Sequence, residues 1–183
     1  MRITAAIRPA FPAAWSTLAL PLALACAAPA AAQARPSLCE QGEQVAFSCP
    51  VGNGANAKIA SLCASPDLSP QKGYVQYRFG RPGAVELIYP ATKAHPRQHF
   101  RWGVLGFSGG GTDYFRFANG GFDYVVYSGI GRGWAKDGVV VEKGGKRLAS
   151  LVCKAPALDG DNWKVMYAAQ LEKIEDPNGF DMP

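Results

Sequence analysis

The segment 112–128, TDYFRFANGGFDYVVYS, decides the fold class of this chain. Two runs rich in aromatic and β-branched residues flank Asn119-Gly120, a dipeptide that supplies the positive φ angles of a short hairpin turn. In the first run, Phe115 and Phe117 alternate with Tyr114 and Arg116, which is the period of a strand with two different faces. The segment therefore predicts an antiparallel β-hairpin.

Strand-like runs of this kind recur through most of the chain, and glycine-containing turns separate them. That spacing is typical of an all-β domain built from hairpins. Eight to nine antiparallel strands are expected, and they form either a small barrel or a sandwich. The predicted ranges are 44–50, 57–64, 73–79, 84–90, 99–107, 112–118, 122–128, 138–143 and 146–153.

Two of these hairpins resemble each other. The matching residues, at a constant offset, are Arg78, Phe79, Gly83 and Tyr89 in one and Arg116, Phe117, Gly121 and Tyr127 in the other. Separately, the run 58–62 resembles 147–151, so the related hairpins occur in mirrored order. Either duplication of a four-stranded unit or convergent β patterning explains this order.

A helix is predicted at about 162–174, capped by Asp161 and ended by Pro177. Its apolar stripe consists of Trp163, Met166, Tyr167, Leu171 and Ile174. We expect this helix to seal one face or end of the β domain, the alternative being an amphipathic helix that binds a partner. Residues 177–183 are expected to form a loose tail.

The first 34 residues have the features of a cleaved secretory signal: Arg2 and Arg8, then an apolar centre at 18–28, then Ala32-Gln33-Ala34 as a small-x-small cleavage site. No later segment reaches the 18 apolar residues of a membrane helix. We therefore expect a periplasmic or secreted protein, with no transmembrane segment and a single domain over 35–176.

Cys26 allows a second interpretation of the N-terminus, as a lipoprotein signal in which that cysteine is lipidated. This is the less favoured interpretation, because Ala23 stands where a branched apolar residue would be expected and a better cleavage site follows.

Removal of the signal leaves four cysteines: Cys39, Cys49, Cys63 and Cys153. An even number in an exported chain predicts two disulfides, with three connectivities open. In a tight hairpin Cys63 would lie opposite about Val45, which disfavours a Cys49–Cys63 bond. The pairs Cys39–Cys63 and Cys49–Cys153 are favoured.

Neither a metal site nor a nucleic-acid partner is expected, nor any cofactor. No cysteine pair has Cys-x-x-Cys spacing, and Pro96 separates His95 from His99, so the two histidines do not share a regular helix. The mature chain has 17 basic and 14 acidic residues. A net charge of +3, evenly spread, is too small to indicate nucleic-acid binding.

Enzyme activity is not expected either. The stretch 106–110 formally matches Gly-x-Ser-x-Gly, but a β run follows where a nucleophile elbow needs a helix. Asp113, Asp123 and Asp137 are scattered along the chain, with no recognisable pairing of carboxylates.

Two glycine-rich segments are the candidate binding loops. The segment 107–114 is either a slack connector or a loop that presents Ser108 and Tyr114, with Tyr114 on the more polar, outward face of its strand. The segment 128–134 is either a turn in which Trp134 covers one end of the fold, or a contact surface made by Arg132 and Trp134.

The run Ser108-Gly109-Gly110-Gly111-Thr112-Asp113-Tyr114 resembles the Ser-Gly-x-Gly-x-x-Tyr signature of bacterial periplasmic and membrane-bound lysozyme inhibitors. Those are small exported β proteins that insert this loop into the lysozyme cleft, where its serine bonds a catalytic carboxylate. The resemblance implies that Ser108 inserts, that Gly111 permits the turn, and that Tyr114 braces the loop or contacts the enzyme.

The sequence thus predicts a non-enzymatic binding protein that acts through the 107–114 loop on a protein target, a lysozyme by resemblance. The alternative is a structural or assembly component of the cell envelope that uses its Tyr- and Arg-bearing outer face for protein contacts. Edge strands would also permit a homodimer.

Overall fold

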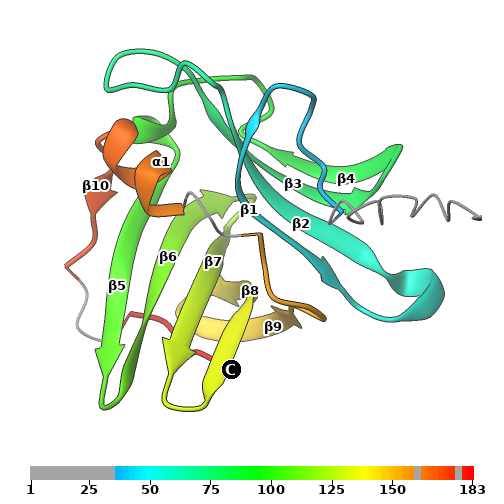
Figure 1. Ribbon diagram of the computed structural model, residues 1–183, viewed down its shortest axis with the longest axis vertical. Coiled ribbons are helices and arrows are strands. Elements are labelled where there is room, and N and C mark those ends of the chain that lie inside the picture. The colour runs from blue at the N-terminus through cyan, green and yellow to red at the C-terminus, as the bar shows by residue number, and fades with distance from the viewer. Residues whose placement is uncertain (1–35, 159–161, 176–178) are drawn as a thin grey trace, which may run out of the picture. The chain divides into compact units, whose positions relative to one another are not determined.

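The first sheet is an antiparallel meander with the spatial order β1-β2-β3-β4 (Figure 1). The computed structural model describes residues 36–158, 162–175 and 179–183. The strands are β1 (Gln44–Val51), β2 (Lys58–Ala64), β3 (Val75–Arg81) and β4 (Ala84–Tyr89), and a 3-10 turn, η1 (Gly54–Asn56), joins the first two.

The second sheet has the order β10-β5-β6-β7-β8-β9. Its strands are β5 (Arg101–Phe107), β6 (Gly110–Asn119), β7 (Phe122–Gly131), β8 (Trp134–Lys143), β9 (Lys146–Val152) and β10 (Glu172–Lys173). Its pairings are antiparallel except between β10 and β5. A 3-10 turn, η2 (Pro96–Gln98), precedes β5. Nine of the strands correspond to the nine predicted ranges.

The two sheets form an open, sandwich-like arrangement rather than a closed barrel (Figure 1). The all-β class is confirmed. Of the two architectures that the sequence left open, barrel and sandwich, the structure has the sandwich-like one. Apolar residues at alternate positions of both sheets are buried together in one core. At its centre the Phe117 ring stacks on Tyr89 of the first sheet, at 4.7 Å between centroids, and on Tyr124 of its own sheet, at 4.9 Å.

Both favoured disulfides are present, and each connects different parts of the fold. The Cys49–Cys153 bond joins β1 to the residue after β9, where Val51 and Cys153 also form an isolated β-bridge. The Cys39–Cys63 bond ties the N-terminal segment to β2. Cys63 lies opposite Val45, as predicted. Two disulfides indicate an extracytoplasmic protein, whereas the predicted signal 1–34 lies outside the described residues.

The C-terminal helix is shorter than predicted. α1 spans Asn162–Ala168, and the chain then turns through Gln170, whose φ of 48° is left-handed. The amide of Leu171 bonds the Met166 carbonyl, which closes the helix end. The next residues leave the helix because β10 pairs with β5, and this tertiary contact overrides the local apolar pattern.

The apolar stripe of that helix is also only partly correct. Met166 and Leu171 are buried as expected, but Tyr167 is 64% exposed and Val165 is buried instead. The helix packs on the domain, in line with the expected sealing role. The predicted cap Asp161 and the predicted stop Pro177 lie outside the described residues. In the part of the chain that the structure describes, no helix has the length and apolarity needed to span a membrane.

The internal repeat is retained in part. Arg78 and Arg116 both lie on the outer faces of their sheets, opposite the half-buried Phe79 and the buried Phe117. The tyrosines differ, because Tyr89 belongs to the main core whereas Tyr127 belongs to a second cluster. The β3–β4 pairing contains a bulge that the β6–β7 pairing lacks. This bulge shifts the register by one residue, so the Tyr89 side chain lies on the opposite face of its sheet from the one that Tyr127 occupies.

Candidate functional site

The glycine-rich segment 107–114 is a tight hairpin and not an extended loop. β5 ends at Phe107 and β6 begins at Gly110, so only Ser108 and Gly109 lie between the strands. Gly109 has a φ of 83°, which favours glycine. Gly111 is a strand residue opposite Gly106. The expectation that Gly111 permits the turn is therefore wrong, because this role falls to Gly109.

The second glycine-rich segment, 128–134, forms an equally tight turn beside the first. β7 continues through Gly131 and β8 starts at Trp134, which leaves Arg132 and Gly133 as the turn. The Arg132 amide donates a hydrogen bond of 2.9 Å to the Gly109 carbonyl. The two turns are thus joined, and Ser108 and Arg132 lie at the same end of the second sheet.

An aromatic pair fixes these turns from the outer face of the sheet. The rings of Phe107 and Trp134 stack with centroids 5.4 Å apart, and so connect β5 to β8 across the two central strands. The Trp134 ring lies directly over Gly131, where a Cβ atom would come within 2.2 Å of the indole. Only glycine leaves room for this ring, which explains part of the glycine content. We call residues 107–109 and 131–134 the tip.

Tyr114 does not present its side chain to a partner. It lies on the face opposite Phe115, as predicted, but it is only 1% exposed. The expected outward exposure is wrong, because Phe180 covers the ring at 5.2 Å in an edge-on arrangement. Of the two roles that the resemblance implies for Tyr114, bracing is the one compatible with this burial.

The cover comes from the C-terminal strap, residues 179–183, which the sequence predicted to be part of a loose tail. Phe180 is 5% exposed and packs on Tyr114 and Tyr127. Three side chains of the sheet donate hydrogen bonds to backbone carbonyls of the strap: Arg116 to Gly179, Arg147 to Asp181, and Lys136 to Pro183. The prediction of a loose tail is therefore wrong for these residues, since the outer aromatic face of the sheet needs a cover.

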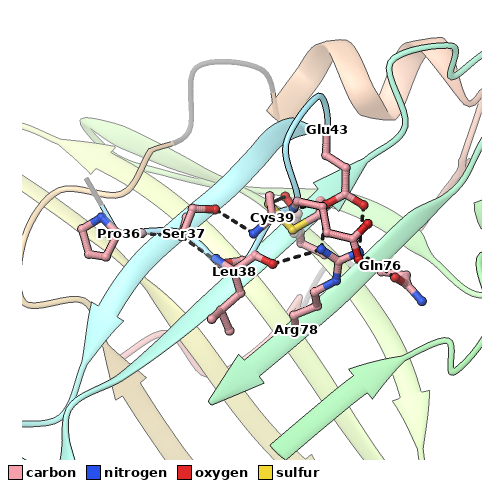
Figure 2. The surroundings of a disulfide bond; sticks show 12 residues. Pro36, Ser37, Leu38, Cys39, Glu43, Gln76 and Arg78 are labelled. Atoms are coloured by element: carbon pink, nitrogen blue, oxygen red, sulfur yellow. Dashed lines mark hydrogen bonds and ion pairs between the residues drawn. A yellow bond between two sulfur atoms is a disulfide. The ribbon is translucent and has the colours of Figure 1, made fainter. Parts of the chain in front are cut away.

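A second strap, residues 36–43, covers the outer face of the first sheet around the Cys39–Cys63 disulfide (Figure 2). Arg78, whose side chain is 4% exposed, donates to both carboxylate oxygens of Glu43, at 2.6 and 2.8 Å, and to the Leu38 carbonyl. Burial alone would raise the pKa of Glu43, but hydrogen bonds from Arg78 and Tyr74 outweigh it and lower that pKa. Arg78 and Arg116 therefore have equivalent structural roles: Arg78 binds the N-terminal strap and Arg116 binds the C-terminal strap.

The residues considered for chemistry are not assembled into a reactive site in the described ranges. His95 contacts the Ser69 carbonyl and His99 the Tyr89 ring. The grouping nearest to a metal site among the described residues is Cys39, Glu43 and Cys63, and its two sulfurs are joined in a disulfide. No described His or Asp side chain has a hydrogen bond to Ser108.

Comparisons of this chain with protein-family models, with curated proteins and with solved structures give no match. The candidate site therefore rests on the geometry of the tip. Sequence reasoning identified Ser108, Arg132 and Trp134 individually. It missed their proximity and the contribution of Phe107. The signal that could have shown both is strand register, because two hairpins with equal strand lengths place alternate turns side by side.

Proposed function

We propose that this protein is a non-enzymatic binding protein, periplasmic or secreted, which contacts a protein target through the tip. The observation that carries the proposal is the exposed Ser108 on a two-residue turn that Arg132 and the Phe107–Trp134 stack hold in place. A recognition element held in one conformation loses little entropy on binding. Trp and Arg are also the residue types most enriched at interface hot spots.

A lysozyme is the target class that this chemistry fits best. Lysozyme cleaves its substrate with two carboxyl groups in a cleft. A serine hydroxyl can donate a hydrogen bond to one carboxylate, and an arginine beside it supplies the opposite charge. The rigid tip brings both groups forward together, which supports the role that the resemblance to lysozyme inhibitors implies for Ser108.

The alternative, an envelope component that assembles through its outer Tyr- and Arg-bearing face, has less support. Both straps cover that face, and Arg78 and Tyr114 are buried beneath them. A homodimer formed through edge strands stays a prediction.

The test is inhibition of lysozymes from several structural classes by the purified, oxidised protein. Ser108→Ala is expected to weaken inhibition of the susceptible class about tenfold or more, since a hydrogen bond to a charged group contributes roughly 1.5–3 kcal/mol. Arg132→Ala is expected to have a comparable effect. Both variants should unfold at the wild-type temperature, because their side chains are exposed.

Matched controls separate the tip from the rest of the surface. Ser150→Ala removes an exposed serine on β9, and Lys146→Ala removes an exposed cation at the β8–β9 turn. Both controls should inhibit like the wild type. Inhibition by none of the proteins, or equal loss in the controls, would refute lysozyme recognition through the tip.

A further inference from the structure

The inner face of the second sheet continues beyond the part that the first sheet covers. In Figure 1 the β5–β6 and β7–β8 turns lie far from β1–β4. The last row that belongs to the core runs across β5, β6, β7 and β8 at Trp102, which is half-buried, and at Phe115, Val126 and Val139, which are buried. The two rows closer to the tip have the same side-chain direction, and the side chains of Val104, Asp113 and Ile130 in them are exposed.

We call these uncovered residues the shelf: Val104, Asp113 and Ser128 in one row, and Gly106, Gly111 and Ile130 in the next. Val104 is 46% exposed and Ile130 is 69% exposed. A Cβ atom on Gly106 would meet nothing within 4 Å, so the surface between the two apolar side chains is open. The shelf is continuous with the tip along the chain, because Gly106 directly precedes Phe107 and Ile130 directly precedes Gly131.

Asp113 gives the shelf its chemistry. Asp137, which lies in the same row beyond Ser128, accepts hydrogen bonds from the Ser128 hydroxyl, at 2.6 Å, and from the Ala157 amide, at 2.9 Å. The Asp113 side chain makes no hydrogen bond or ion pair with any described residue. The Asp113 side chain is exposed, and the residues around it remove enough water to raise the pKa of its carboxyl. An exposed carboxylate without a partner among the described residues, beside exposed apolar side chains, can accept charge-assisted hydrogen bonds from an external cation.

From this arrangement we infer that the shelf is the docking surface for the target, and that the target places an arginine side chain on Asp113 between Val104 and Ile130. Arginine fits better than lysine because its planar, weakly hydrated guanidinium can bond both carboxylate oxygens while it lies against apolar side chains. The inference deepens the proposed binding function and rests on it for the identity of the target. It adds the chemistry of the contact: an arginine flanked by apolar residues.

The shelf can be tested without knowing the target. The probe is N-acetyl-leucyl-arginine amide, titrated at millimolar concentration into the ¹⁵N-labelled, oxidised protein. N-acetyl-leucyl-citrulline amide serves as its uncharged counterpart. Amide shifts caused by the arginine probe should cluster at residues 104, 113, 128 and 130, and the citrulline probe should bind at least fivefold more weakly. Asp113→Asn should remove this difference between the probes.

Two variants act as controls in the same titration. Asp123→Asn neutralises a carboxylate at the far end of the β6–β7 hairpin, and Ser150→Ala alters an exposed serine of β9 outside the tip and the shelf. Both should bind the arginine probe like the wild type. Scattered shifts, or equal binding of the two probes, would overturn the inference. Amide shifts at the shelf that change with protein concentration but not with the probe would also overturn the inference, since they would show that the shelf binds a second copy of the chain.

The two proposals fail in different ways. If a lysozyme is inhibited, Asp113→Asn should weaken its binding about tenfold, as expected for the loss of a charge-assisted contact, while Asp123→Asn should not. Inhibition unchanged by Asp113→Asn, together with no probe binding, would reject the shelf and leave the tip intact. Probe binding at the shelf without inhibition of any lysozyme would reject the target class and retain the shelf.

Discussion

At the scale of single residues, the most instructive pair is Arg78 and Glu43, because a charge in a nearly dry position is acceptable only when it is fully bonded. Arg78 bonds the Glu43 carboxylate, the Gln76 side chain and the Leu38 carbonyl. Its counterpart Arg116 bonds Glu142 and the Gly179 carbonyl. Each arginine connects a strap to a sheet, so these outward-facing charges are structural.

The lowered pKa of Glu43 predicts a pH dependence of stability. A carboxyl with a lower pKa in the folded state than in the unfolded state stabilises the fold above its unfolded pKa of about 4.3, and the contribution disappears as pH falls through the folded value. Glu43→Gln should therefore cost roughly 2 kcal/mol at pH 7, in the range for hydrogen bonds to charged groups. The difference from wild type should shrink below about pH 4.

Urea unfolding of both proteins at pH 7 and at pH 3 measures this change. Glu86→Gln is the matched control, because Glu86 bonds Lys58 at 2.6 Å in an exposed pair. Exposed pairs contribute about 0–1 kcal/mol. A cost for Glu43→Gln that stays constant with pH would show that only its shape and packing matter.

At the scale of elements, the C-terminal strap gives the second prediction. Phe180→Ala should remove the cover from Tyr114 and Tyr127 and cost about 3–5 kcal/mol, as for a buried aromatic ring. Burial raises the pKa of Tyr127 to about 12, so opening the strap should move the phenol titration of Tyr127 back toward 10. Ultraviolet titration near 295 nm together with thermal unfolding records both effects.

Leu148→Ala is the control for this change, since Leu148 is 59% exposed on β9. It should alter neither the melting temperature nor the titration. If Phe180→Ala left the tyrosine titration unchanged, the strap would contribute packing but no solvent protection.

The elements that were predictable from sequence are those with local causes. Strand ranges follow from side-chain alternation and turn residues, both of which lie within a few positions of each other. The predictions that were wrong concern contacts between residues far apart in the sequence. The helix α1 ends earlier than predicted because β10 pairs with β5. Residues 179–183 pack on the sheet because they cover aromatic residues that lie 50 to 70 positions earlier. The same holds for the tip, whose residues were identified separately but joined only by the register of four strands.

At the scale of the whole molecule, the two disulfides have different tasks. The Cys49–Cys153 bond closes a separation of 104 residues and connects the first sheet to the end of the second. The Cys39–Cys63 bond closes 24 residues and holds only the N-terminal strap. In the chain-entropy description a cross-link stabilises the fold more when it closes a longer loop.

Paired Cys→Ser replacements test this difference. Loss of Cys49–Cys153 should cost roughly 4–5 kcal/mol and loss of Cys39–Cys63 roughly 3–4 kcal/mol by loop entropy, measured by urea unfolding of each double variant. A larger cost for Cys39–Cys63 would reverse the order. In that case the contacts of the N-terminal strap with Arg78, rather than loop closure, would determine the loss of stability. The stability cost of Cys39→Ser/Cys63→Ser combined with Glu43→Gln should then be less than the sum of the separate costs, because both changes release the same strap.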